Sequence, residues 1–202
     1  IENIKNIFKK KNFFEKKYLS DVLFSTDLTE DAFINKNIQD YKYIHIAAHG
    51  IHDLENPKLS GILMGRKIND LSDGLLQSHE IFPLILNSNL VTLSSCFSGF
   101  GQIDDSEGNL GIYRTFLIAG SKSVIISLWD VDDKSTSIFF TKFYEYLKSG
   151  KTKSQSLRLA KLYLRDQTNY EHPFYWAVFG LMIIFFTYFY TAIAFDPVQV
   201  SS

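Results

Sequence analysis

The chain has 202 residues, of which 46% are hydrophobic and 21% are charged, and its formal net charge is −1. This length fits one domain whose core can hold together without disulfides, and the composition excludes a disordered chain. The near-zero net charge argues against direct contact with nucleic acid. With a single cysteine, Cys96, no intrachain disulfide can form, so we expect a cytoplasmic protein. Because the chain starts at Ile1, without an initiator Met or a signal-peptide pattern, we expect it to be part of a longer protein.

Hydrophobic periodicity and turn residues predict alternating strands and helices along the chain. The predicted strands are 22–24, 43–47, 90–93, 124–128 and one that begins near Phe174, with a hairpin through 61–64. The predicted helices are 27–39, 75–82, 107–119, 133–149 and 154–167. Gly120 and Gly150 are placed to end two of them.

Strands separated by helices predict an α/β fold, a three-layer sandwich with a mostly parallel sheet and helices on both faces. Right-handed crossovers predict that all of these strands run in the same direction. In such a sheet, functional side chains gather at the carboxyl ends of the strands.

Three groups of reactive or polar residues follow predicted strands at that edge. They are His49 with Gly50, Cys96, and the acidic residues Asp130, Asp132 and Asp133. A thiol at a strand end is exposed, and a nearby histidine can accept its proton and later return it. Gly50 leaves its N–H open to a substrate oxygen. The alternative is a purely structural role, in which Cys96 is a small apolar core residue, since free cysteine is usually buried.

Other readings of the same residues are weaker. His45 and His49 are four residues apart, and on a strand they would face the same way and could hold a metal, but the stretch lacks the Glu of a zinc-protease helix. The stretch "SSCFSG" does not match the G-x-S-x-G motif of α/β-hydrolases, and the chain has no P-loop. We therefore expect neither a metal nor a cofactor.

Six stretches resemble the CHAT domain, a family in the caspase-like group of cysteine peptidases that also includes separase. They occur in the family's order: "YIHIAAHG", "NPKLSGILMG", "DGLLQSHEI", "LVTLSSCFSGFG", "SEGNLGIYRTFLIAGSKSVIISLWDVDD" and "HPFYWAVFGLMI". Positions 49 and 96 differ by 47, close to the spacing of about 50 residues in caspases. The resemblance covers residues 1–182, the predicted peptidase domain, and leaves 183–202 as a hydrophobic tail.

The resemblance implies a caspase-like fold and a cysteine endopeptidase that cleaves a protein or peptide substrate. It implies that Cys96 is the nucleophile, that His49 is the general acid and base, and that the N–H groups of Gly50 and Cys96 form the oxyanion hole. The alternative is a catalytically silent interaction module with the same fold. The resemblance also implies upstream helical repeats and regulation by a protein partner.

Acidic residues near the predicted site are candidates for substrate binding. The stretch "SLWDVDDK" resembles the separase segment whose acidic residue receives a basic substrate side chain, and Asp130 is the matching position. Asp133 and Asp105 could line the same pocket. Asp132 or Asp133 could instead cap the following helix, and Asp105 could do the same for the helix near 107.

The end of the chain carries an uncharged stretch from Pro173 to Phe195. Its 23 residues would be long enough to cross a bilayer, which takes about 20. The resemblance, however, uses 173–182 as the last core strand, and 183–195 is short for a span. We therefore favour a hydrophobic extension packed on the domain or on a partner over a membrane anchor.

Overall fold

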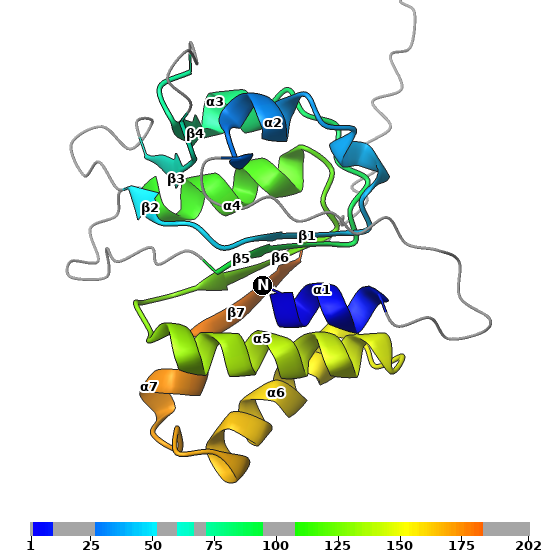
Figure 1. Ribbon diagram of the computed structural model, residues 1–202, viewed down its shortest axis with the longest axis vertical. Helices are drawn as coiled ribbons and strands as arrows, with labels where there is room; N and C mark the ends of the chain where they lie inside the picture. Colours follow the sequence, from blue (N-terminus) through cyan, green and yellow to red (C-terminus); the bar gives the residue numbers. More distant parts are fainter. Residues whose placement is uncertain (1, 10–26, 52–59, 67–71, 95–107, 184–202) are drawn as a thin grey trace, which may run out of the picture.

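The computed structural model describes residues 2–9, 27–51, 60–66, 72–94 and 108–183. Its middle layer is a four-stranded sheet in the order β1-β5-β6-β7 (Figure 1). The strands are β1 (Tyr43–Ile46), β5 (Leu90–Leu93), β6 (Ser123–Ser127) and β7 (Phe179–Ile183). β1, β5 and β6 are parallel, and β7 is antiparallel to β6. The predicted mostly parallel sheet is therefore confirmed.

Helices cover both faces of this sheet, as Figure 1 shows. On one face lie α2 (Glu30–Ile34), α3 (Ser78–Ile81) and α4 (Gly108–Ile118). On the other lie α1 (Glu2–Lys9) and α5 (Asp133–Lys148), with α6 (Lys153–Gln167) packed against α5. A 3-10 helix, η2 (Ile38–Asp40), precedes β1, and a short helix, α7 (Pro173–Trp176), precedes β7. This arrangement confirms the predicted three-layer α/β sandwich.

The central strands β5 and β6 are mostly apolar because both of their faces are buried. Val91 and Leu93 of β5 join the cluster that contains Phe116 of α4. Leu90 of the same strand joins the second cluster, which contains Phe139 of α5. Neighbouring strand residues thus serve two separate cores, one under each helical layer.

A second, antiparallel sheet of three short strands, in the order β2-β3-β4, lies beside the main one. Its strands are β2 (Gly50–Ile51), β3 (Gly61–Leu63) and β4 (Leu75–Gln77). The pairing of β3 with β4 confirms the hairpin predicted through 61–64. The helix predicted over 75–82 is wrong in its first turn, because 75–77 pair with β3. A capping box between Gln77 and Glu80 starts α3 only at Ser78.

The helix predicted over 27–39 is also shorter than expected. α2 begins after Thr29, whose hydroxyl accepts a hydrogen bond from the Ala32 amide at 3.1 Å. The helix therefore does not begin at Asp27 as predicted. α2 ends at Ile34, and the chain then forms η2 instead of continuing the α-helix.

The last strand differs from prediction in both its start and its direction. β7 begins at Phe179, because Pro173 starts α7, whose N-cap is the imidazole of His172. Two long helices, α5 and α6, separate β6 from β7. α5 runs from the carboxyl edge of the sheet to the edge where β6 begins, and α6 returns the chain to the carboxyl edge. β7 therefore enters from the carboxyl edge and runs antiparallel to β6.

The start of α5 is fixed by Asp132, one of the two predicted caps. Its carboxylate accepts hydrogen bonds from the amides of Lys134 and Ser135 at 2.9 and 3.0 Å. We expect Asp132→Ala to lower the free energy of unfolding by about 1 kcal/mol, because both amides lose their acceptor. Asp132→Asn is the matched control and should keep most of the cap. Urea unfolding measures both, and equal stability of the Ala and Asn variants would contradict this role.

Several predicted features lie outside the described residues. They are the strand at 22–24, Cys96, Asp105, and the tail from 184 onward. Within the part of the chain that the structure describes, no helix combines the length and apolar character needed to cross a membrane.

Candidate active site

The two strands that precede His49 and Cys96 are neighbours in the sheet. β1 and β5 pair in parallel, with Ile46 opposite Leu93. The amide of Ser94 donates to the carbonyl of Ile46 at 3.0 Å, which extends this pairing by one residue. His49 and Cys96 each follow the paired positions 46 and 93 by three residues. The strands that precede His49 and Cys96 thus end at the same edge of the sheet, as predicted, while Cys96 itself lies outside the described residues.

His49 is exposed, and the small sheet holds its backbone. The Leu63 amide donates to the His49 carbonyl at 2.7 Å. This bond flanks the Gly50–Ile62 pair, which makes that pair a non-hydrogen-bonded one. The N–H of Gly50 therefore points away from β3. An N–H in this position can serve a substrate oxygen, as an oxyanion donor must.

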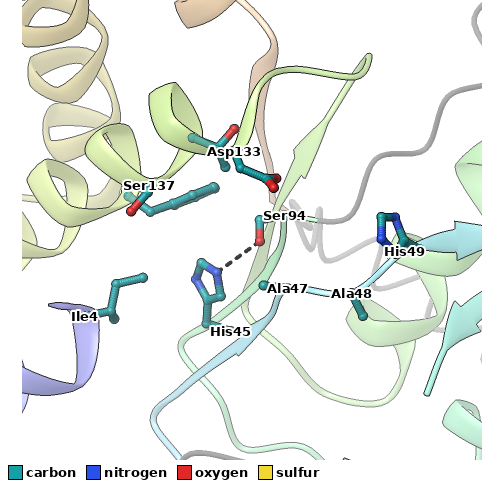
Figure 2. Close-up of a pocket in the computed structure, with 10 residues that line it drawn as sticks. Ile4, His45, Ala47, Ala48, His49, Ser94, Asp133 and Ser137 are labelled. Atoms are coloured by element: carbon teal, nitrogen blue, oxygen red, sulfur yellow. Dashed lines mark hydrogen bonds between the residues drawn. The ribbon is translucent and has the colours of Figure 1, made fainter. Parts of the chain in front are cut away.

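A pocket of about 310 Å³ opens at the carboxyl end of β1 and β5. Figure 2 shows side chains from β1, from the residues that follow β1 and β5, and from α1 and α5 around it. Its lining residues are Ile4, His45, Ala47, Ala48, His49, Ser94, Asp133, Thr136, Ser137 and Phe140. The walls are thus partly apolar, with a few hydroxyl, imidazole and carboxylate groups, as in many ligand sites.

One wall of the pocket comes from the first helix. Ile4 of α1 lines it, and Ile7 and Phe8 of the same helix pack on the α5 side of the sheet. The side chain of Lys148 on α5 donates to the Ile7 carbonyl, which fastens the two helices together. The apolar face of α1 thus packs on the sheet and α5 and contributes Ile4 to the pocket.

His45 lies deeper in the pocket than His49 and is only half-buried by its neighbours. Its Nδ1 lies 3.1 Å from the Tyr144 hydroxyl, and its Nε2 lies 3.1 Å from Ser94 Oγ. The Phe140 ring meets the imidazole edge to face, with ring centres 5.0 Å apart. Burial lowers the pKa of His45 to about 3, so the ring is neutral near pH 7.

The geometry does not favour the metal alternative for His45 and His49. Both ring nitrogens of His45 have protein partners. Among the described residues, moreover, no three His, Cys, Asp or Glu side chains are grouped so that they could hold a metal ion.

The predicted acidic residues occupy different places. Asp133, in the first turn of α5, lines the pocket, and Figure 2 shows its carboxylate on the side of Ser94. Asp130 is exposed and does not line this pocket. Its neighbour Trp129 turns toward α7, where the indole N–H donates to the Phe174 carbonyl at 2.9 Å. Asp105 lies outside the described residues.

Sequence reasoning missed three polar residues of the site: Ser94, Thr136 and Ser137. Ser94 directly follows β5, so its place at the strand end was a usable signal. Thr136 and Ser137 lie on α5 one turn after its cap. Nothing in the sequence indicates that this turn faces the ends of β1 and β5.

Comparison with known proteins agrees with the fold. The model of the family described as CHAT domain matches residues 1–185. The mouse protein Tetratricopeptide repeat protein 28 is 32% identical over 112 residues, which are 55% of this chain and 4% of that protein. Its human counterpart is 31% identical over 123 residues, 59% of this chain and 5% of that protein. The chain thus spans only a small fraction of the length of these relatives.

Proposed function

Because the chain belongs to the CHAT domain family, we propose that it is a cysteine endopeptidase domain that cleaves protein substrates with Cys96 and His49. The observation that carries the proposal is the parallel pairing of β1 with β5, in the register of Ile46 with Leu93. β1 and β5, which end three residues before His49 and Cys96 in the sequence, end side by side, and His49 lines a pocket there together with Ser94.

In the proposed reaction, His49 takes the proton of the Cys96 thiol, and the sulfur attacks the scissile carbonyl carbon. The N–H groups of Gly50 and Cys96 stabilise the negative oxygen of the tetrahedral intermediate. His49 then gives the proton to the leaving amine, and the C–N bond breaks. Water hydrolyses the remaining thioester by the reverse sequence and frees the thiol. The exposure of His49 supports this role, since substrate can reach its ring.

We further propose that the domain works within a larger protein that contains helical repeats. The support is that both curated relatives are named as tetratricopeptide repeat proteins and are much longer than this chain. Such repeats, or a protein partner, would control access to the site. A cytoplasmic location fits this proposal.

The proposal is tested by labelling with a peptide that carries a thiol-reactive electrophile, followed by intact mass measurement. We expect one adduct, on Cys96, in the presence or absence of candidate activators. His49→Ala should slow the labelling at least tenfold, because the thiol loses its base. His79→Ala is the matched control, since His79 is an exposed histidine on α3 that does not line the pocket. If the domain bound a protein partner but formed no adduct, it would instead be a catalytically silent interaction module.

The pocket also leads us to propose a preference for a basic substrate residue before the cut, with Asp133 as its main partner. Its carboxylate lies at a pocket whose apolar wall, Phe140, can pack along the stem of an Arg or Lys. Asp130 and Asp105 stay as further candidates. Arg should be preferred over Lys, because its planar fork binds both carboxylate oxygens.

Asp133→Asn is expected to lower kcat/KM for basic substrates about three- to tenfold and to leave uncharged substrates nearly unchanged. The effect is modest because Asp133 is exposed, so solvent screens the ion pair. Asp130→Asn is the matched comparison, one charge removed three residues earlier. A peptide library varied at the residue before the cut measures both variants. A loss confined to Asp130→Asn would move the role to Asp130, and a wild-type preference for apolar or acidic residues would reject the proposal.

A further inference from the structure

A chain of polar side chains crosses the otherwise apolar core between the sheet and α5. His45 and Thr92 are paired neighbours on β1 and β5. The hydroxyl of Tyr144, on α5, bridges them at 3.1 Å from His45 Nδ1 and 2.9 Å from Thr92 Oγ1. Tyr144 and Thr92 are fully buried. At the other end of the chain, His45 Nε2 meets Ser94 Oγ in the pocket, as Figure 2 shows.

The hydrogen-bond contacts of these four side chains determine which of them donates and which accepts in each contact. Ser94 Oγ is 3.3 Å from the Ile46 carbonyl, which can only accept, so the serine donates there. His45 must then donate its Nε2–H to Ser94, and its unprotonated Nδ1 accepts from the Tyr144 hydroxyl. Thr92 in turn donates to Tyr144. This is the arrangement in which every one of these contacts is a hydrogen bond.

This arrangement decides what His45 can do. A neutral imidazole whose Nε2 carries the proton cannot take the proton of Ser94, so the two are not a nucleophile and its base. The imidazole of His45, on β1, instead holds Ser94 in place by a hydrogen bond. The same ring contacts Tyr144 of α5, so it links β1, α5 and the residue that directly follows β5. Ser94 also bonds to the Ile46 carbonyl through its amide at 3.0 Å. Its side chain and its backbone are thus both tied to β1.

We propose that His45 is a positioning residue for the proposed nucleophile: its donated Nε2–H fixes Ser94, which precedes Cys96 by two residues in the sequence. This inference rests on the proposed function, because it concerns the approach to the proposed nucleophile. Displacement of a reacting group by about 1 Å can lower a rate about 100-fold. The anchor is rigid, since Tyr144 and Phe140 hold the ring from α5.

Two substitutions distinguish the hydrogen bond that Nε2 makes with Ser94 from the one that Nδ1 makes with Tyr144. In His45→Gln, the amide NH₂ can reach the place of Nε2 and still donate to Ser94. In His45→Asn, the shorter side chain reaches only the place of Nδ1 and still accepts from Tyr144. We expect kcat of the Asn variant to fall about 10- to 100-fold with KM changed less than about threefold. The Gln variant should stay within about threefold of the wild type.

A second readout does not depend on cleavage. The rate of Cys96 alkylation by iodoacetamide at pH 6 reports how far His49 favours the thiolate. We expect it to fall in His45→Asn and to be retained in His45→Gln. If the two variants differ in alkylation in this way but the wild-type protein cleaves no peptide, the inference stands and the proposed function fails.

Ser94→Ala provides a variant that leaves His45 and its anchor intact, in case His45→Asn folds poorly. It should reproduce the loss of rate, and the double variant Ser94→Ala with His45→Asn should be no slower than either single one. Equal rates in the Asn and Gln variants, in cleavage and in alkylation, would overturn the inference. A changed pH profile with both variants inactive would also overturn it, because His45 would then take part in proton transfer itself.

Discussion

Cys96→Ala is expected to abolish peptide cleavage, with kcat lowered by at least about 1,000-fold, and to leave the melting temperature within about 2 °C of the wild type. The rate falls because the methyl group of alanine cannot form the thioester, so the covalent route is closed. We expect the stability to be retained, because the proposed role requires a thiol that is open to substrate and therefore buries little apolar area. The measurement pairs cleavage of a fluorogenic peptide or a protein substrate with thermal unfolding followed by circular dichroism.

The outcome shows whether Cys96, the only cysteine in the chain, is a nucleophile or a structural core residue. Cleavage that persists in Cys96→Ala, together with a clear loss of stability, would make this residue part of the core. His49→Ala should lower the rate at least tenfold, and His79→Ala should not change it. If both histidine variants were as active as the wild type, His49 would have no role in the reaction.

Gly120→Ala is expected to cause the largest loss of stability, about 2–5 kcal/mol. Gly120 ends α4 with a φ of +111°, which L-residues adopt only at a cost of about 1–2 kcal/mol. A Cβ at this position would also lie 2.2 Å from the carbonyl oxygen of Leu86, a buried residue. The Leu86 amide is itself hydrogen-bonded to the Ala119 carbonyl at 2.6 Å, so the clashing backbone cannot simply move away. Relieving this overlap adds about 1–3 kcal/mol.

Gly150→Ala is the matched control for this substitution. Gly150 also ends a helix with a positive φ, +90°, but an added Cβ would meet no atom within 4 Å. Its loss should therefore be only the backbone cost of about 1 kcal/mol. Urea unfolding of both variants compares them directly. Equal losses at the two glycines would show that the contact with Leu86 relaxes freely.

Much of the fold can be read from local patterns. The apolar runs that form β5 and β6 are recognisable because strands buried on both faces carry hydrophobic side chains at most positions instead of at every second one. The ends of α5 and α6 are marked by Asp132, Thr152 and Gly150, whose side chains or backbone freedom satisfy helix ends within a few residues. The same local patterns place His49 and Cys96 just beyond strand ends, which was enough to propose the site.

Other features depend on partners that are distant in the sequence. Leu75 and Leu76 form β4 only because β3 lies beside them, and β7 runs antiparallel because α5 and α6 together reverse the chain. Figure 1 shows that β1 and β5 are neighbours although the whole small sheet and α3 intervene in the sequence. Strand order follows from how the layers pack, and no stretch of the sequence carries that information.

The sequence by itself determined the fold class, the family resemblance and the candidate pair of His49 and Cys96. Only the tertiary structure decided which other groups share their pocket. It brings Asp133 to the pocket while Asp130 stays in solvent, because the first turn of α5 faces the ends of β1 and β5. It also joins His45 to Tyr144, 99 residues away, because the half-buried imidazole lies against α5 and finds a hydrogen-bonding partner on that helix.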